Sequence, residues 1–167
     1  MGLFQLFKGK DAGKAADTKI VLGAPAKGEF VPMAQVPDEV FSQGIMGVCC
    51  GVAPSEGSVY APVDGTVSQL TDTLHAVGLE AAGMELLIHV GVDTVEMAGD
   101  GFSNAVQVGQ QVKKGDLLLT MDLGKIRAAG HADTVIMAVT NSDSFNAVEP
   151  AASGAVEAGD PVLQVSK

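Results

Sequence analysis

Aromatic residues are scarce in this 167-residue sequence, which has six Phe, one Tyr and no Trp. Nearly half of the residues are nevertheless hydrophobic, which is enough for one domain of ordinary size to bury a sizeable core. We therefore expect an aliphatic core built from Val, Ile, Leu, Ala and Met.

Positive charge is also in short supply. Ten Lys and Arg stand against twenty Asp and Glu, so the formal net charge is −10. A nucleic-acid-binding protein needs a concentrated basic surface, and this class is therefore excluded. An acidic surface keeps a protein in solution and can attract a basic partner protein.

Long apolar segments are missing as well. No run approaches the roughly 18 residues of a membrane-spanning helix, and the start lacks the apolar segment of a secretion signal. We expect a cytoplasmic protein with a flexible tail at 1–18 and a single domain at 19–167. The apolar start of the tail, Gly2–Phe7, could instead form a short amphipathic helix with a weak contact to a membrane surface.

Cysteine occurs only twice, at the adjacent positions Cys49 and Cys50. Adjacent cysteines do not supply the separated ligand pairs of a usual zinc site, and they rarely form a disulfide with each other. Buried or half-buried free thiols in a reducing compartment are the expected state.

Glycine and proline, by contrast, punctuate many short apolar runs. Runs rich in aliphatic residues recur about every eight to twelve positions, which is typical of an all-β sandwich or barrel. Two short helical segments are expected, at 37–41 and 123–129. The predicted strands cover residues 20–22, 28–31, 65–67, 85–92, 107–108, 117–121, 135–140 and 162–165.

Two pairs of segments repeat each other within the chain. The sequence APAKGEF at Ala24–Phe30 resembles APVDGTV at Ala61–Val67, and VKKGDLL at Val112–Leu118 resembles VEAGDPV at Val156–Val162. The glycine in each segment permits a tight turn. These repeats predict two intertwined copies of one β-motif rather than two domains in tandem.

Histidine is found at three positions, and one of them lies in a strongly apolar segment. His89 is in the predicted strand 85–92, where it shares a face with Leu87 and Gly91. A histidine on an apolar strand is usually a packed core residue, but a nearby glycine lets a backbone or a phosphate come close. His131 follows a glycine in a loop-like stretch and is predicted to be a surface residue.

His75 lies in a second β-type run, 72–77, and Thr73 shares its face. If this strand neighbours that of His89, two imidazoles and a hydroxyl converge. Such a set suits phosphoryl transfer, because one ring nitrogen can attack phosphorus while the other groups donate hydrogen bonds to the phosphoryl oxygens. Histidine also titrates near neutrality, so a neutral nucleophile is available at pH 7.

From about residue 20 to the C-terminus, the chain resembles the glucose-type IIA component of the bacterial phosphoenolpyruvate-dependent sugar phosphotransferase system. This resemblance implies an all-β fold, an antiparallel β-sandwich of duplicated hybrid motifs with short helical turns. The chain departs from the family pattern where Val77, Ile88 and Val90 replace aromatic residues, and at Val48–Cys50. The matching segments are Val36–Phe41, Ala61–Val67, Thr73–Ala76, Glu85–Glu96, Gly101–Phe102 and Gly109–Asp116.

The resemblance also implies a set of roles. His89 would be phosphorylated at Nε2, with His75 as the supporting histidine and Thr73 beside it. The donor would be phosphorylated HPr, and the acceptor a cysteine in the IIB domain of a glucose-family permease. In enterobacterial relatives the unphosphorylated form also binds and inhibits transporters and glycerol kinase. The regulatory partners that the resemblance implies, in carbon catabolite repression, are sugar permeases, glycerol kinase and adenylate cyclase.

No cofactor is required by these roles. In relatives, a zinc ion can be held between the two histidines and a carboxylate of the partner, and two imidazoles are compatible with such a site at His75 and His89. An apolar docking face is also implied. Its candidate residues are Val40, Phe41, Ile45 and Met46 together with Asp93, the apolar four being ordinary core residues in the alternative interpretation.

Three other functions compete with that of a phosphocarrier. A biotinyl- or lipoyl-carrier domain has similar turns, but it needs a modified lysine in a characteristic setting that is lacking here, and this chain is about twice too long. A zinc peptidase on a related β-motif needs a His-x-His pair, which is also lacking. A purely regulatory binding protein with the same fold stays open.

Overall fold

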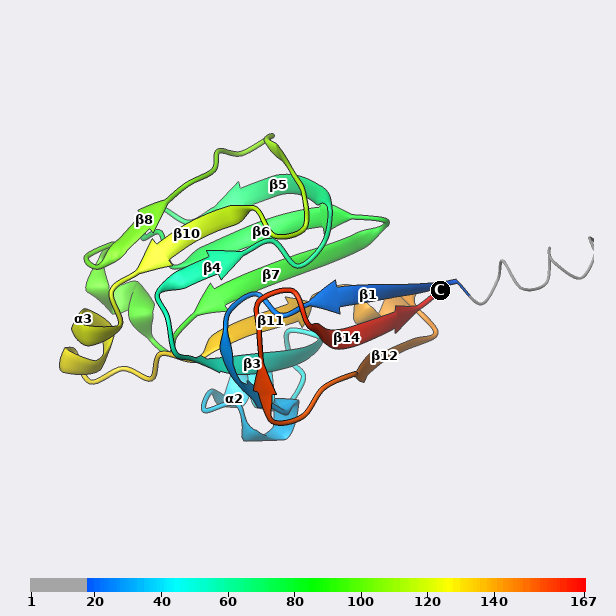
Figure 1. The fold of residues 1–167 in the computed structure, drawn as a ribbon, viewed down its shortest axis with the longest axis horizontal. Helices are drawn as coiled ribbons and strands as arrows, with labels where there is room; N and C mark the ends of the chain where they lie inside the picture. The colour runs from blue at the N-terminus through cyan, green and yellow to red at the C-terminus, as the bar shows by residue number, and fades with distance from the viewer. Residues whose placement is uncertain (1–17) are drawn as a thin grey trace, which may run out of the picture.

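The computed structural model describes residues 18–167, so the predicted tail lies outside the described residues except for Thr18 (Figure 1). None of the helices in this part of the chain is long and apolar enough to cross a membrane. The strands are β1 (Lys19–Gly23), β2 (Gly28–Val31), β3 (Val48–Pro54), β4 (Ser58–Tyr60), β5 (Gly65–Leu70), β6 (Ala76–Ala81), β7 (Met84–Val90), β8 (Phe102–Asn104), β9 (Gln111–Val112), β10 (Leu117–Met121), β11 (Val135–Val139), β12 (Ala147–Pro150), β13 (Ala155–Val156) and β14 (Pro161–Ser166). The helices are α2 (Glu39–Ser42) and α3 (Leu123–Ala128), with short 3-10 turns η1 (Met33–Gln35), η2 (Thr94–Met97) and η3 (Ser142–Ser144).

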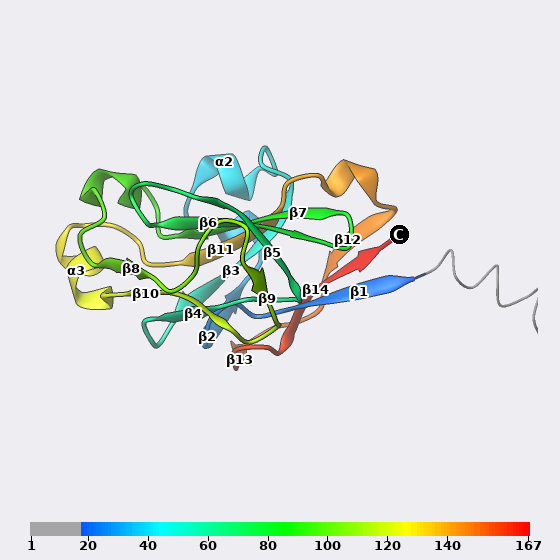
Figure 2. The ribbon, with the colours of Figure 1, turned by 90° about the horizontal axis from the view of Figure 1, so that it is seen from above.

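The strands form one large and two small antiparallel sheets. The large sheet has the order β13-β2-β3-β11-β7-β6-β5-β9, and the small sheets have the orders β1-β14-β12 and β4-β10-β8. Figure 2 shows α2 on one side of the large sheet and β8 and β10 on the other. The prediction of an all-β, antiparallel sandwich with only short helices is confirmed.

Strand β7 lies between β6 and β11 and separates two hydrophobic clusters. Its alternate residues Met84, Leu86, Ile88 and Val90 belong to the main aliphatic core. Leu87 faces the opposite side of the sheet, where it packs against a small cluster. This period-two alternation is what a strand with apolar side chains on both faces produces. The buried members of the small cluster are Val36, Phe41, Cys49, Ile136 and Ala138.

The two cysteines illustrate the same alternation. Cys50 is in the main core and Cys49 is in the small cluster, and both are buried and free. Burial, with a smaller effect from the carboxylate of Asp38, raises the pKa of Cys49 to about 11. The expected buried free thiols are confirmed, and neither is activated as a nucleophile.

The repeated segments occupy equivalent places. Strand β2 pairs with β13 so that Gly28 lies opposite Val156, and β5 pairs with β9 so that Gly65 lies opposite Val112. In each pairing, a segment of the Ala-Pro type (Ala24–Phe30 or Ala61–Val67) lies beside a segment of the Gly-Asp type (Val156–Val162 or Val112–Leu118). The two copies of the motif are therefore interlocked, as the sequence predicted.

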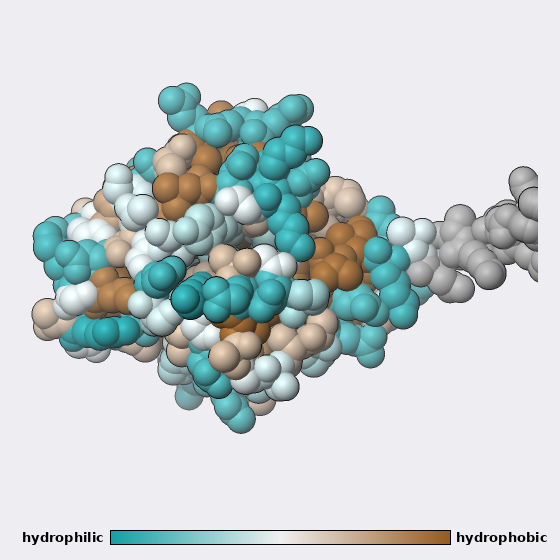
Figure 3. Space-filling model, in the orientation of Figure 1, coloured by the Kyte–Doolittle hydropathy of each residue, from teal (hydrophilic) through white to brown (hydrophobic). Residues whose placement is uncertain are grey.

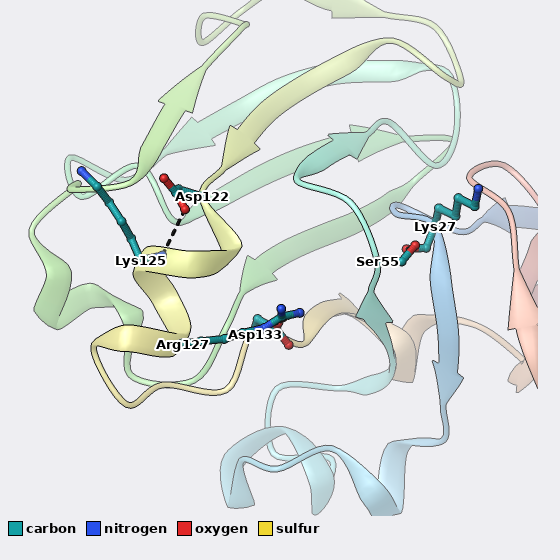
Figure 4. Close-up of polar contacts among 6 residues, drawn as sticks. All are labelled: Lys27, Ser55, Asp122, Lys125, Arg127 and Asp133. Carbon is teal, nitrogen blue, oxygen red and sulfur yellow. Dashed lines mark hydrogen bonds and ion pairs between the residues drawn. The ribbon is translucent and has the colours of Figure 1, made fainter.

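The predicted helices are present with slightly different ends. Asp38 caps α2 through Oδ1, which accepts hydrogen bonds from the amides of Val40 (2.9 Å) and Phe41 (3.4 Å). Asp122 caps α3 by accepting from the amide of Lys125 at 3.0 Å (Figure 4). An aspartate at this position satisfies amides that have no partner inside the helix.

Two contacts outside these caps tie loops to their neighbours. Arg127 forms an ion pair of 2.7 Å with Asp133, which joins α3 to the segment leading into β11 (Figure 4). The Ser55 hydroxyl donates to the carbonyl of Lys27 at 3.3 Å.

One predicted strand starts later than expected. Residues 72–75 form a turn, with Leu74 at a φ of +64°, and β6 begins only at Ala76. The amide of Leu74 donates to the carbonyl of Thr71, which closes this turn. The β-type side chains of the segment hid the turn, because no Gly or Pro marks it.

Candidate functional site

His89 lies near the end of β7, on the face of the large sheet that carries the small cluster. In the β6–β7 and β11–β7 pairings it is opposite Ala76 and Ile136. Its ring is half-buried and packs against Phe41 of α2, with centroids 5.2 Å apart and a tilt of 50°. The strand places the histidine, and the short helix provides one wall of its surroundings.

The proton of the His89 ring is placed by a backbone carbonyl. Nδ1 of His89 lies 2.9 Å from the carbonyl oxygen of Gly91. A carbonyl can only accept, so in the neutral ring Nδ1 carries the hydrogen and donates it. The lone pair then resides on Nε2, which makes Nε2 the nucleophilic atom.

Gly91 has a position that no other residue fills without strain. Its φ is +79°, and a Cβ there would lie 2.4 Å from the methyl group of Thr94 and 2.8 Å from the carbonyl oxygen of Ala132. Its amide donates to the carbonyl of Thr134 at 2.7 Å. A glycine at this position therefore lets the Ala132 carbonyl and the Thr94 side chain come close to the backbone, and the Gly91 carbonyl orients the His89 ring.

His75 is the residue immediately before β6, and it is buried. Its ring meets that of His89 edge to face, with centroids 4.8 Å apart and planes at 85°. Its carbonyl accepts from the amide of Val90 at 2.8 Å, which anchors the turn to β7. Thr73 Oγ1 lies 2.7 Å from Nδ1 of His75. The predicted convergence of two imidazoles and one hydroxyl is thus present.

Both imidazoles are biased toward their neutral forms. Burial and the proximity of His89 lower the pKa of His75 to about 4, against a smaller raising effect from Thr73. Burial also lowers the pKa of His89, while the Gly91 hydrogen bond and the carboxylates of Asp38 and Asp93 act in the opposite direction. A neutral His89 is the form that can attack an electrophile.

The predicted docking residues occupy different environments. Val40 and Ile45 are exposed, at 43% and 67%, and Met46 is half-buried. Phe41 is only 5% exposed and packs on His89, so it forms a wall of the site instead of open surface. Asp93 is exposed and begins the turn that leads into η2.

Sequence reasoning missed part of this site. The carboxylate of Asp38 raises the pKa of His89 although the two residues are far apart along the chain. Val95, on η2, adds an exposed apolar side chain at 52%. His131 is also less open than predicted, since its side chain is 13% exposed and lies 3.9 Å from Glu96.

Residues 18–167 contain no group of three or more His, Cys, Asp or Glu side chains arranged to hold a metal. Nδ1 of His89 is engaged by Gly91, and Nδ1 of His75 by Thr73. The Nε2 atoms of the two rings are the nitrogens that this arrangement leaves for a ligand. Two imidazole ligands are half of a tetrahedral zinc shell.

Comparison with known proteins agrees with this fold. Residues 20–145 match the model of the phosphoenolpyruvate-dependent sugar phosphotransferase system, EIIA 1 family. The solved structure of glucose permease IIA from Mycoplasma capricolum is similar, with a TM-score of 0.77 and 29% identity, and the match covers 89% of this chain and 96% of that one.

A longer curated protein is similar over nearly the whole chain. The PTS system beta-glucoside-specific EIIBCA component of Dickeya chrysanthemi is 45% identical over 156 residues, which are 93% of this chain and 24% of that protein. This chain therefore spans about a quarter of the length of that relative. Together these matches define a IIA-type component of a phosphotransferase system. The chain belongs to the EIIA 1 family, as the resemblance in its sequence indicated.

Proposed function

We propose that this chain is a phosphoryl carrier in which His89 takes a phosphoryl group from phosphorylated HPr. It then passes the group to a cysteine in the IIB domain of a glucose-family permease. The observation that carries the proposal is the hydrogen bond between His89 Nδ1 and the Gly91 carbonyl, because it leaves the lone pair on Nε2.

The chemistry needs few catalytic groups. Neutral Nε2 attacks the phosphorus of the donor phosphohistidine, a new N–P bond forms, and the donor's own N–P bond breaks to release a neutral imidazole. In the second step a cysteine thiolate attacks phosphorus, the S–P bond forms, and the Nε2–P bond breaks. The proton of His89 stays on Nδ1 throughout, where it is hydrogen-bonded to the Gly91 carbonyl, so no general base is required.

His75 and Thr73 would support the transferring group. When the Thr73 hydroxyl donates to Nδ1 of His75, the proton of the neutral His75 ring is on Nε2. That N–H can donate to a phosphoryl oxygen, where it stabilises charge in the transition state. The short distance between the two rings suits this role.

The surroundings of the histidines favour a basic partner with apolar contacts. The carboxylates of Asp38 and Asp93 raise the pKa of His89. Val40 in α2 and Ile45 in the loop after it are exposed apolar residues. A IIB partner also agrees with the name of the Dickeya relative, which joins B, C and A portions. Since phosphoenolpyruvate feeds this system inside the cell, we place the carrier in the cytoplasm.

The same surface would serve regulation. We propose that the unphosphorylated form presents Val40, Ile45 and the neutral histidines to regulated proteins, and that a phosphoryl group on His89 weakens this contact by adding charge. His75 and His89 fit a zinc ion as two of its ligands, the others coming from the partner or water. Zinc would then act as a bridge across the interface.

Phosphorylation of a single histidine is the direct test. The protein is incubated with phosphoenolpyruvate, enzyme I and HPr, and its mass is measured before and after treatment with acid or base. We expect one phosphoryl group that is labile in acid and stable in base. It should be absent from His89→Ala and present in His131→Gln, the matched control. A gain that persists in His89→Ala would refute the assignment.

A further inference from the structure

A buried hydroxyl lies in the turn that follows β7 and has no role in the chemistry described above. Thr94 is 0% exposed and is the first residue of η2. Its hydroxyl donates to the carbonyl of Val90, four residues back along the chain. Its methyl group covers Gly91, where a Cβ would lie only 2.4 Å from it.

We infer that Thr94 is a positioning residue that holds the Gly91 carbonyl on Nδ1 of His89. Since His89 is the acceptor only in the function proposed above, the catalytic part of this role rests on that function. The Thr94 hydroxyl fixes the carbonyl at residue 90, and its methyl group packs against residue 91. The Gly91 carbonyl therefore belongs to the peptide next to the Val90 carbonyl that Thr94 binds, and to the residue against which the Thr94 methyl group packs.

The opposite side of this turn is held by backbone hydrogen bonds. The amide of Gly91 donates to the carbonyl of Thr134 at 2.7 Å, and the amide of Val92 donates to that of Ala132 at 3.1 Å. Asp93 follows with a φ of +60°, a left-handed conformation that aspartate tolerates better than most residues. On the inner side of the turn, the Thr94 hydroxyl donates a hydrogen bond to the Val90 carbonyl.

The consequence for His89 concerns its tautomer. A neutral imidazole in water carries its proton on either nitrogen, and the Nε2–H form has no lone pair on Nε2 for attack. A carbonyl held at 2.9 Å from Nδ1 selects the reactive form. If the carbonyl turns away, part of the population is unreactive.

Substitutions at Thr94 separate the hydroxyl from the shape of the side chain. Thr94→Val keeps the volume and removes the donor, whereas Thr94→Ser keeps the donor and removes the methyl group. The tautomer is read from long-range ¹H–¹⁵N NMR correlations of the His89 ring at pH 8. We expect the Nδ1–H form in the wild type and Thr94→Ser, and a mixture of tautomers in Thr94→Val.

The rate of phosphoryl acceptance is measured on the same proteins. Loss of one hydrogen bond is expected to slow acceptance from phosphorylated HPr by about 3- to 10-fold, with an unchanged half-saturating HPr concentration. Thr94→Ala serves as a second variant if Thr94→Val does not fold, and backbone NMR spectra check the fold. A merely structural role would lower the melting temperature without changing the ring-nitrogen shifts.

Several results would overturn the assignment. These are a folded Thr94→Val or Thr94→Ala protein with wild-type His89 shifts, or a tautomer change with no loss of rate. The NMR readout needs no donor protein. If the wild type accepts no phosphoryl group, the proposed function fails while the shifts still test the effect of Thr94 on the ring.

Discussion

At the scale of single residues, the two histidines share a neutral state but differ in how they are held. His89 donates from Nδ1 to a carbonyl, which can only accept. His75 contacts a hydroxyl, which can either donate or accept. His89 therefore has a defined nucleophilic nitrogen, and His75 can present an N–H to a charged oxygen. The sequence supplied both residue types, and the division of labour follows from their partners.

Replacing His75 by Gln separates acceptance of the phosphoryl group from its donation. We expect His75→Gln to accept the group on His89, because the nucleophile is intact. Transfer to the IIB cysteine should fall about 100-fold, since a group that stabilises transition-state charge is lost. The measurement is the discharge rate of the isolated phosphoprotein after IIB is added, with His131→Gln as control. Normal sugar phosphorylation by His75→Gln would contradict this division.

At the scale of elements, the site depends on the pairing of β6 with β7. The register that places Ala76 opposite His89 brings the preceding turn, with its histidine, over the His89 ring. A slip by one residue would turn His89 into the main core, because side chains alternate between faces. The left-handed turn at Leu74 precedes β6 and the Gly91 turn follows β7, and these two strand ends are neighbours because the strands pair antiparallel.

The turn after β7 should be unusually sensitive to a methyl group. Gly91→Ala meets Thr94 and Ala132 as well as the cost of a positive φ, whereas Gly130→Ala, with a φ of +83°, has no atom within 4 Å of its Cβ. We expect Gly130→Ala to lose about 1–2 kcal/mol of stability. Gly91→Ala should lose about 1–3 kcal/mol more, and its His89 phosphorylation should fall as well.

Urea denaturation of the two glycine variants gives the free energy of unfolding for this comparison. Equal losses in both would show that the contact with Thr94 and Ala132 relaxes at no cost. Such a result would also weaken the view that the turn is closely packed against Thr94.

At the scale of the whole molecule, two interlocked β-motifs enclose an aliphatic core. The face in Figure 3 is largely hydrophilic, and its hydrophobic surface is divided into separate small areas. The acidic composition adds a net charge of −10 over the full chain. This negative charge can attract basic partner proteins to the folded domain.

His75 and His89 also make the stability of the whole fold depend on pH. The pKa of His75 falls from 6.5 to about 4 on folding, so between these values the unfolded chain binds a proton that the folded chain does not. The free energy of unfolding should therefore decrease as the pH falls from about 6.5 toward 4, and it should be level above that window with respect to this group. The lowered pKa of His89 acts in the same direction.

Urea denaturation at a series of pH values measures this dependence. His75→Gln should show a shallower slope across the window, because it lacks one of the two groups. An identical slope in the variant would contradict the assignment of the effect to His75. Control measurements with His131→Gln account for the third histidine of the chain.

How much of this molecule could be predicted from its sequence depends on the range of the interactions. The strand around His89, the aliphatic core and the repeated turns were predicted, because periodicity and glycine placement act locally. The turn at 72–75 was not, since its side chains are typical of strands. The influence of Asp38 on His89 could not be read from the sequence either, and the sequence left open whether Phe41 is a core or a docking residue.

The sequence by itself determined which chemistry is available: three histidines, no separated cysteine ligands, and a glycine two residues after His89. The tertiary structure alone decided which histidines meet and which nitrogen is free. The alternation of a strand decides only the face on which a side chain lies. The partner across the sheet is set by long-range packing, and here it placed His75 against the His89 ring and the Gly91 carbonyl on Nδ1.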